Sequence, residues 1–226
     1  MKTAIQESVE RLDDTELIVR TRAGDMRALE ALMRRHNRTL YRTARAILRD
    51  DAEAEDAVQE AYLQAYKALG TFRGESKLST WLVRITANEA LMRRRKNART
   101  AVVVPMDTAT ASEQWEDPMS DEPGPEQGAL RGEMRRLLES RIDALPDGYR
   151  TVFVLRALEE LTVEETAAAL DIPEPTVRTR FFRARGLLRE SLARDIDRSL
   201  DDAFGFAGER CDRIVARVLE RIRSGT

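Results

Sequence analysis

The sequence predicts an all-α protein, with two small helical domains joined by a flexible acidic linker and followed by a C-terminal helical extension. Apolar residues recur at spacings of three and four through residues 13–100 and 129–192, which is the helical period. Residues 101–128 hold four prolines and seven carboxylates but no lysine or arginine, a composition that opposes packing. No run of alternating polar and apolar residues beside a turn signal indicates a β-hairpin.

The first domain, residues 13–100, contains four expected helices. Asp13 or Asp14 caps a short helix that ends at Gly24, and Asp25 starts a longer helix that reaches Leu48. The acidic stretch 50–56 leads into a third helix, whose apolar stripe is Val58, Ala61, Tyr62, Ala65 and Leu69. Ser79 or Thr80 opens the fourth helix. His36 lies in an apolar stripe of the second helix, so we expect it to pack between helices.

The second domain, residues 129–192, carries the sharpest local pattern. Thr162 and Glu165 have the spacing of a capping box, residues 171–175 form a turn, and Pro175 or Thr176 starts the next helix. This arrangement predicts a helix-turn-helix. The apolar side of its second helix comprises Val177, Phe181, Ala184 and Leu188.

Residues 193–226 form the extension, in which residues 211–222 are a candidate amphipathic helix. Its apolar stripe comprises Cys211, Ile214, Val215, Val218, Leu219 and Ile222. We expect this stripe to dock on one of the domains or on a partner, and Cys211 to be a buried apolar group rather than a redox sensor.

Composition excludes several kinds of protein. The 226 residues include one His and one Cys, too few for a zinc site or a disulfide framework. Few nucleophile–base pairs are available and no glycine-rich phosphate loop is present, so we expect neither an enzyme nor a bound cofactor or metal. No apolar run approaches the roughly 20 residues of a membrane span, and no signal-peptide pattern is visible. We therefore expect a cytoplasmic protein that does not insert into membranes.

Basic residues are concentrated near the end of each domain, although the net charge is only −2. Residues 84–99 contain six bases and one acid, and residues 176–194 contain six bases and one acid as well. Such clusters are typical of phosphate binding, because each neutralised phosphate releases condensed counterions. One cluster alone could equally be a solvated helix face; two clusters, one in each domain, favour nucleic acid.

The second helix of the helix-turn-helix projects Arg178, Thr179, Phe182 and Arg183 from its polar side. A recognition helix reads the major groove with its N-terminal residues, and arginine is the usual bidentate donor to guanine. The alternative is a protein-binding or purely structural helix pair.

The sequence DAVQEAYLQAYKAL at 56–69, then TFRGES at 71–76 and STWLVRITAN at 79–88, resembles extracytoplasmic-function (group 4) sigma factors of bacterial RNA polymerase, members of the sigma-70 family. The resemblance covers region 2 of that family, at about residues 13–98, and region 4, at about residues 130–192. It implies a non-catalytic subunit that binds core RNA polymerase and directs promoter-specific initiation. It also implies control by an anti-sigma factor.

The resemblance also implies three sets of site residues. The minus-35 element would be contacted by Thr176, Arg178, Thr179, Phe182 and Arg183. The minus-10 element would be melted and read by Lys77, Leu78, Ser79, Thr80, Trp81, Arg84 and Asn88, with Trp81 equally compatible with a core position. The clamp helices of the largest polymerase subunit would be contacted by Asp56, Gln59 and Glu60, a face that without the resemblance reads as merely solvated.

The linker cannot fix the distance between the two domains. A flexible chain of 28 residues averages about 30 Å end to end, whereas promoter elements two helical turns apart are separated by about 70 Å. We therefore expect the free chain to bind promoter DNA weakly and to gain specificity on the polymerase. Two other readings remain open: a one-component regulator that binds operators alone, and an adaptor protein that binds no DNA.

Overall fold

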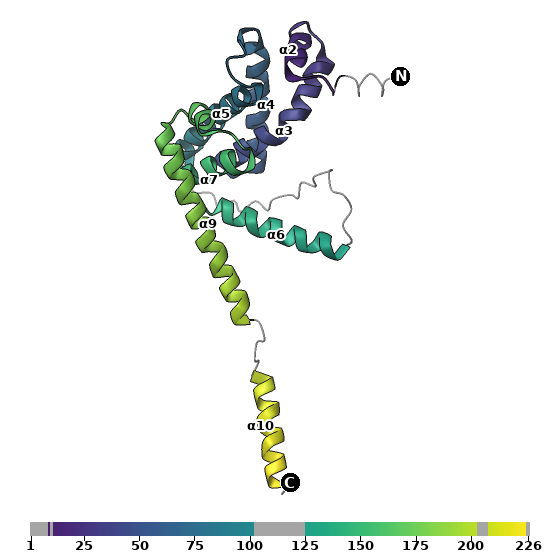
Figure 1. Ribbon diagram of the computed structural model, residues 1–226, viewed down its shortest axis with the longest axis vertical. Coiled ribbons are helices and arrows are strands. Elements are labelled where there is room, and N and C mark those ends of the chain that lie inside the picture. The colour runs from purple at the N-terminus through teal and green to yellow at the C-terminus, as the bar shows by residue number, and fades with distance from the viewer. Residues whose placement is uncertain (1–8, 10, 102–124, 203–207, 225–226) are drawn as a thin grey trace. The chain divides into compact units, whose positions relative to one another are not determined.

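The computed structural model describes residues 9, 11–101, 125–202 and 208–224. Every regular element in these ranges is helical (Figure 1), which confirms the predicted class. In order they are α2 (Asp14–Arg22), α3 (Met26–Leu48), α4 (Asp51–Ala68), the 3₁₀-helix η1 (Leu69–Thr71), α5 (Leu78–Ala101), α6 (Pro125–Asp143), α7 (Asp147–Phe153), the π-helix η2 (Val154–Leu158), α8 (Val163–Leu170), α9 (Glu174–Asp202) and α10 (Gly208–Arg223).

Aspartates cap the N-termini of α2, α3 and α4. The carboxylates of Asp13, Asp25 and Asp50 accept hydrogen bonds from backbone N–H groups of the first turns of α2, α3 and α4, at 2.8 to 3.0 Å. Each bond satisfies a donor that has no partner within the helix. At Gly24, which follows α2, the backbone has φ +88°, a conformation that glycine adopts without strain.

The first module, α2 to α5, encloses an aliphatic core. Its most deeply buried large side chains include Leu17, Leu40, Ile47, Leu82 and Val83. His36 is buried beside them, as expected of a helix-packing residue. Helix α5 begins at Leu78, one residue before the predicted start, because this leucine joins the core.

The second module contains the helix-turn-helix. Thr162 Oγ1 accepts from the N–H of Glu165 at 3.1 Å, and Glu165 Oε2 accepts from the N–H of Thr162 at 2.8 Å, so the predicted capping box is confirmed. Asp171 ends α8 in the left-handed region, and α9 begins three residues later at Glu174. Helix α6 begins at Pro125, within the range predicted as linker; residues 102–124 of that range lie outside the described residues.

The two modules pack directly against each other. Residues up to Gly186 form one compact unit, in which α7 lies against α3 and α8 lies against α5. The length of the linker predicts no fixed distance between the domains, whereas in the structure side chains join the two modules independently of the linker. Arg150 of α7 is completely buried there and donates to the Ala46 carbonyl oxygen, in the last turn of α3.

The second compact unit begins at Leu187 and includes α10. The apolar side chains of α10 from Ile214 to Ile222 are exposed, at 46 to 70%. Cys211 lies on this helix, but its side chain is outside the described set, so its predicted burial stays a prediction.

Candidate nucleic-acid interface

The N-terminal half of α9 has one buried and one exposed side. Val177 and Ala184 are completely buried, whereas Phe182 is 79% exposed. Arg178, Thr179 and Arg183 are exposed on the same side as Phe182, as the sequence pattern predicts. This side of α9 therefore presents one aromatic ring, two arginines and a threonine to solvent.

Phe181 separates the two sides of α9. Its ring is half-buried and stacks on Phe153 of α7, with 6.2 Å between ring centroids. The guanidinium of Arg156 lies 5.5 Å from its centroid and that of Arg185 lies 5.8 Å away. This aromatic and cationic contact fixes the rotation of α9 about its axis.

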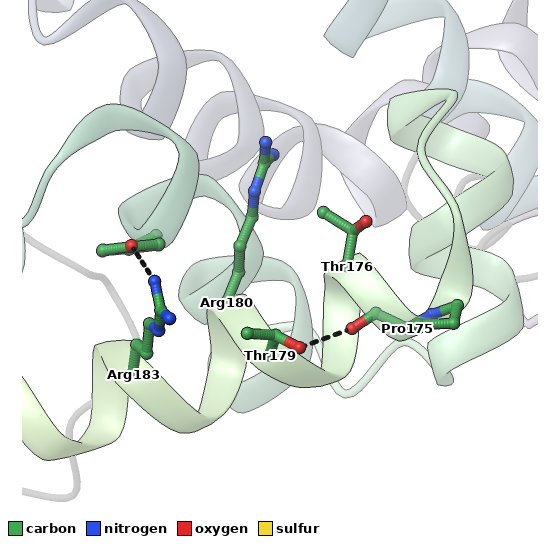
Figure 2. A pocket seen from close by; sticks show the side chains of 6 residues that line it. Pro175, Thr176, Thr179, Arg180 and Arg183 are labelled. Carbon is green, nitrogen blue, oxygen red and sulfur yellow. Dashed lines mark hydrogen bonds between the residues drawn. The ribbon is translucent and has the colours of Figure 1, made fainter.

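A pocket of about 340 Å³ lies between the start of α9 and α7. Figure 2 shows Arg180 and Arg183 projecting from α9 beside the two threonines of its first turns. The pocket is lined by Tyr149, Pro175, Thr176, Thr179, Arg180 and Arg183, with no carboxylate among them. Two guanidinium groups and a helix N-terminus make this an electropositive cavity suited to an anion.

Tyr149 and Arg180 line this pocket although sequence reasoning did not select them. Arg183 Nη1 donates to the Tyr149 hydroxyl at 3.2 Å. The Arg180 guanidinium lies against Gly148, where an added Cβ atom would stand 3.2 Å from its central carbon. In the sequence, the only sign of this close approach is Gly148, which has no side chain. The tertiary structure is needed to show that the Arg180 guanidinium occupies the space beside it.

Arg178 forms an ion pair with Glu174, four residues earlier, at 2.7 Å. Both side chains are exposed, and such i,i+4 pairs contribute only about 0.3–0.5 kcal/mol. Arg178 can therefore exchange this carboxylate for a base or phosphate at small cost.

The predicted minus-10 residues lie at and after the start of α5. Lys77, Arg84 and Asn88 are exposed, and Ser79 is half-buried. Trp81 is half-buried and its ring lies 5.1 Å from that of Phe72, at an interplanar angle of 48°. This tilted aromatic pair provides an apolar wall beside a polar helix face.

Two members of this set, Leu78 and Thr80, are covered. Leu78 is 4% exposed because it belongs to the core, and Thr80 is 6% exposed. The Thr80 hydroxyl donates to Glu165 Oε1 at 3.2 Å, and Lys77 Nζ lies 3.3 Å from the same oxygen. The pKa of Glu165 is lowered, first by the hydrogen bond from the Thr162 backbone and further by Lys77.

The outer face of α4 carries the predicted polymerase contacts. Asp56 and Gln59 are exposed and Glu60 is half-buried. Arg93 of α5 reaches this face: its Nη1 lies 3.7 Å from Asp56 Oδ2, and its Nε donates to the buried Glu89 at 2.8 Å. The hydrogen bond to Glu89 is the main cause that raises the pKa of Arg93. The guanidinium of Arg93 is therefore held by carboxylates of the chain itself, whereas the Arg84 side chain is exposed to solvent.

Within the described ranges, no cluster of three or more His, Cys, Asp or Glu residues could hold a metal ion. Among the helices of those ranges, none combines the length and apolar character that crossing a membrane requires.

Comparison with known proteins identifies both modules. Residues 32–100 match the family described as Sigma-70 region 2, and residues 135–188 match Sigma-70, region 4. The RNA polymerase sigma-H factor of Pseudomonas aeruginosa is 35% identical over 184 residues, which are 79% of this chain and 93% of that protein. The ECF RNA polymerase sigma-E factor of Escherichia coli is 36% identical over 180 residues, 78% of this chain and 92% of that protein.

Solved structures agree with these matches. CnrH, in complex with the cytosolic domain of CnrY, superposes with a TM-score of 0.55 and 27% identity, over 80% of this chain and 98% of that one. RpoE of Bartonella quintana, in complex with the anti-sigma factor NepR, has the same fold, with a TM-score of 0.56 and 21% identity over 73% of this chain and 96% of that one. The helix-turn-helix, the first helical module and these relatives together establish that the chain belongs to the extracytoplasmic-function sigma factors of the sigma-70 family, which direct promoter-specific transcription initiation.

Proposed function

We propose that α9 reads the minus-35 element, that the surface around the start of α5 melts and reads the minus-10 element, and that α4 docks on the clamp helices of core RNA polymerase. The observation that carries the proposal is the exposed side of α9 at the turn of a helix-turn-helix, with its arginines and Phe182 presented to solvent. The corresponding functional ranges are residues 13–100, 101–128, 129–192 and 193–226, for region 2, linker, region 4 and extension.

At the minus-35 element, Arg178, Phe182 and Arg183 contact base edges, while Thr176, Thr179 and Arg180 hold the backbone. Arginine gives guanine two parallel hydrogen bonds, and an aromatic ring packs against a thymine methyl group. Thr176, Thr179 and Arg180 lie where a helix N-terminus receives a phosphate. Base contacts thereby set the sequence and phosphate contacts set the register.

At the minus-10 element, Arg84 and Asn88 lie four residues apart and therefore on the same face of α5. An amide bonds a base edge and a guanidinium bonds a phosphate, while Trp81 supports a base that has left the stack. Lys77 and Ser79 complete the surface at the start of the helix, whereas Leu78 supports it from the core and Thr80 is covered in this structure.

Docking on the polymerase uses Asp56, Gln59 and Glu60, the polar face of a helix whose other side is buried in the core. A rigid polar face of this kind gives specificity through charge complementarity with a basic partner. The protein acts as a specificity subunit and leaves catalysis to the polymerase. We also propose that an anti-sigma factor binds this chain, as one binds the RpoE of Bartonella quintana, and that the chain acts in the cytoplasm.

Run-off transcription with purified core polymerase tests the proposal. Adding the chain should produce initiation at discrete sites, and Arg178→Gln should reduce initiation at promoters with an intact minus-35 element at least tenfold. Arg189→Gln is the matched control, since Arg189 is an exposed arginine of α9 beyond the predicted contact positions. A one-component regulator would bind its sites without core enzyme, and an adaptor would support no initiation; either result would overturn the proposal.

A further inference from the structure

We propose that Arg22 is a positioning residue for the minus-10 element: it holds the loop that leads into α5 in the shape that recognition requires. This loop, residues 72–77, is the α4–α5 loop and lies between η1 and the start of α5. The inference rests on the proposed minus-10 role of α5. It adds a residue of α2, which lies outside the motif that locates the minus-10 surface.

Arg22 is the last residue of α2, and its guanidinium reaches the end of α4. Its Nε and Nη2 atoms donate to the Leu69 carbonyl oxygen at 3.1 and 2.8 Å. Nη2 also donates to the Phe72 carbonyl oxygen at 2.7 Å. One planar group therefore joins the first residue of η1 to the first residue of the α4–α5 loop.

The position of Arg22 suits the carbonyl groups that it meets. The last carbonyl groups of a helix lack partners within that helix, and the negative end of the helix dipole favours a cation. The side chain of Leu69 is 5% exposed, so this end of the contact is shielded from water. Arginine can donate to both oxygens from one rigid plane, whereas the ammonium group of lysine is a single point of charge.

The side chains of the α4–α5 loop contribute little to its course. Residues 73–77 are all exposed. The Arg73 and Lys77 side chains form ion pairs, but they remain 83 and 74% exposed, and exposed pairs of this kind are weak. At Gly74 the backbone turns with φ +74°, a conformation that glycine adopts without strain. The course of the loop therefore depends on how its two ends are held.

Both ends of the loop are fixed by the first module. At one end Leu78 is 4% exposed and belongs to the core. At the other end Arg22 holds the Phe72 backbone, and the Phe72 ring lies 5.1 Å from the ring of Trp81. These two rings are the apolar wall that we propose supports an unstacked base. Moving the Phe72 backbone would therefore move part of that wall.

Arg22 acts through the loop rather than by touching DNA. Its Nε and Nη2 atoms are engaged by backbone oxygens of the chain itself. A recognition site needs such support, because its contact groups must be held within about 0.5 Å by the hydrogen bonds around them. Loss of Arg22 should therefore weaken the choice of minus-10 sequence more than it weakens binding in general.

Trp81 reports the position of the loop in the free chain. The sequence contains two tryptophans, so Trp81 is the remaining one in the full chain with Trp115→Phe. In that background Arg22→Gln should shift the Trp81 emission to longer wavelength and increase its quenching by acrylamide. Arg20→Gln is the matched control, since it removes the same charge from α2 at an exposed pair with Glu16. Equal spectra for the two variants would overturn the inference.

Initiation with core polymerase measures the effect on recognition. Arg22→Gln should lower the ratio of initiation between a preferred minus-10 element and its single-base variants at least about threefold, and leave the corresponding minus-35 ratio within about 1.5-fold. A ratio between two promoters does not depend on the folded fraction, so a merely structural defect would not move it. Arg22→Lys should restore part of the preference, and Arg20→Gln should change neither ratio.

A direct contact with DNA would give a different result. If Arg22 bound a phosphate, Arg22→Gln would reduce the salt dependence of promoter binding by roughly one unit of slope and leave the minus-10 ratio unchanged. That combination would overturn the positioning role. So would a change in the Trp81 spectrum without any change in the minus-10 ratio.

The two proposals fail separately. If the wild type initiates at discrete promoters but Arg22→Gln and Arg20→Gln have the same minus-10 ratio, only the role of Arg22 is refuted. If the wild type supports no initiation, the proposed function is refuted, whatever the Trp81 spectra show.

Discussion

The guanidinium of Arg150 donates through Nε to the carbonyl oxygen of Ala46 at 2.6 Å, joining α7 to the last turn of α3. The same side chain donates to the Leu145 oxygen at 2.9 Å and to Asp147 Oδ1 at 2.8 Å. Although burial lowers the pKa of Arg150, the group remains charged at neutral pH, because the ordinary pKa of arginine is far above 7. A fully buried arginine is tolerated here because each of its nitrogen atoms has a partner.

Replacing Arg150 should destabilise the folded unit strongly. Arg150→Met retains most of the side-chain volume but leaves the Ala46 and Leu145 oxygens without this donor, so we expect a loss of about 2–4 kcal/mol in the free energy of unfolding. Urea denaturation followed by circular dichroism measures it. Arg136→Met, at an exposed arginine of α6, is the control. A loss below about 0.5 kcal/mol, within the range of ordinary surface substitutions, would contradict this assignment.

The capping box predicts a smaller local effect. Thr162→Ala removes the acceptor for the Glu165 N–H and should cost about 1 kcal/mol, whereas Thr162→Ser retains the hydroxyl and should cost a few tenths at most. Both values come from the same denaturation experiment. Equal losses in the two variants would mean that the methyl group, and not the hydrogen bond, supports the start of α8.

The pocket between α7 and α9 predicts a phosphate contact by Arg180. Arg180→Gln should weaken DNA binding by the polymerase complex about equally for all sequences and reduce the salt dependence by roughly one unit of slope. Gly148→Ala should have a weaker effect in the same direction, because its Cβ displaces the Arg180 guanidinium. Fluorescence anisotropy across a salt series measures both variants. A loss confined to one promoter sequence would instead assign Arg180 to base reading.

His36 predicts a pH dependence of stability. Burial lowers the pKa of His36 below its ordinary value of 6.5, despite the opposing effect of Asp14, whose Oδ2 lies 3.3 Å from Nε2. The unfolded state therefore binds a proton on acidification before the folded state does, and this contribution to stability is lost as the pH falls below 6.5. Denaturation at pH 7.5 and pH 5.5 should show the wild type losing stability relative to His36→Gln. A constant difference between the two proteins would refute the lowered pKa.

The local features of this fold were readable from sequence because they depend on neighbouring residues. Aspartate caps, the capping box of Thr162 and the two sides of α9 follow from helical spacing alone. The contact between Glu165 and Thr80 was not readable, since it joins residues 85 positions apart through the packing of two modules. Chain-length arguments concern only the reach of the linker, and they carry no information about side chains that dock the modules directly.

The pocket between α7 and α9 also contains contacts that the sequence could not predict, in this case within a single module. Arg183 and both threonines could be assigned from the recognition-helix pattern, whereas Tyr149 comes from α7 and meets Arg183 only in the tertiary structure, where Phe153 of α7 also stacks on Phe181. Leu78 and Thr80 belong to the predicted minus-10 set, yet one is held in the core and the other lies under Glu165. The sequence motif therefore predicted where the minus-10 surface lies, but it could not predict which of its side chains are exposed, because their exposure depends on how the two modules pack.

Selection of initiating promoters from a random library, with core polymerase and either the wild type, Arg178→Gln or Asn88→Ala, tests the central claim most directly. For the wild type, the account predicts two enriched elements at a fixed spacing. Arg178→Gln should lose sequence preference in the upstream element alone, and Asn88→Ala should lose sequence preference in the downstream element alone. Initiation without any enriched pair of elements, or identical selections from all three proteins, would contradict it.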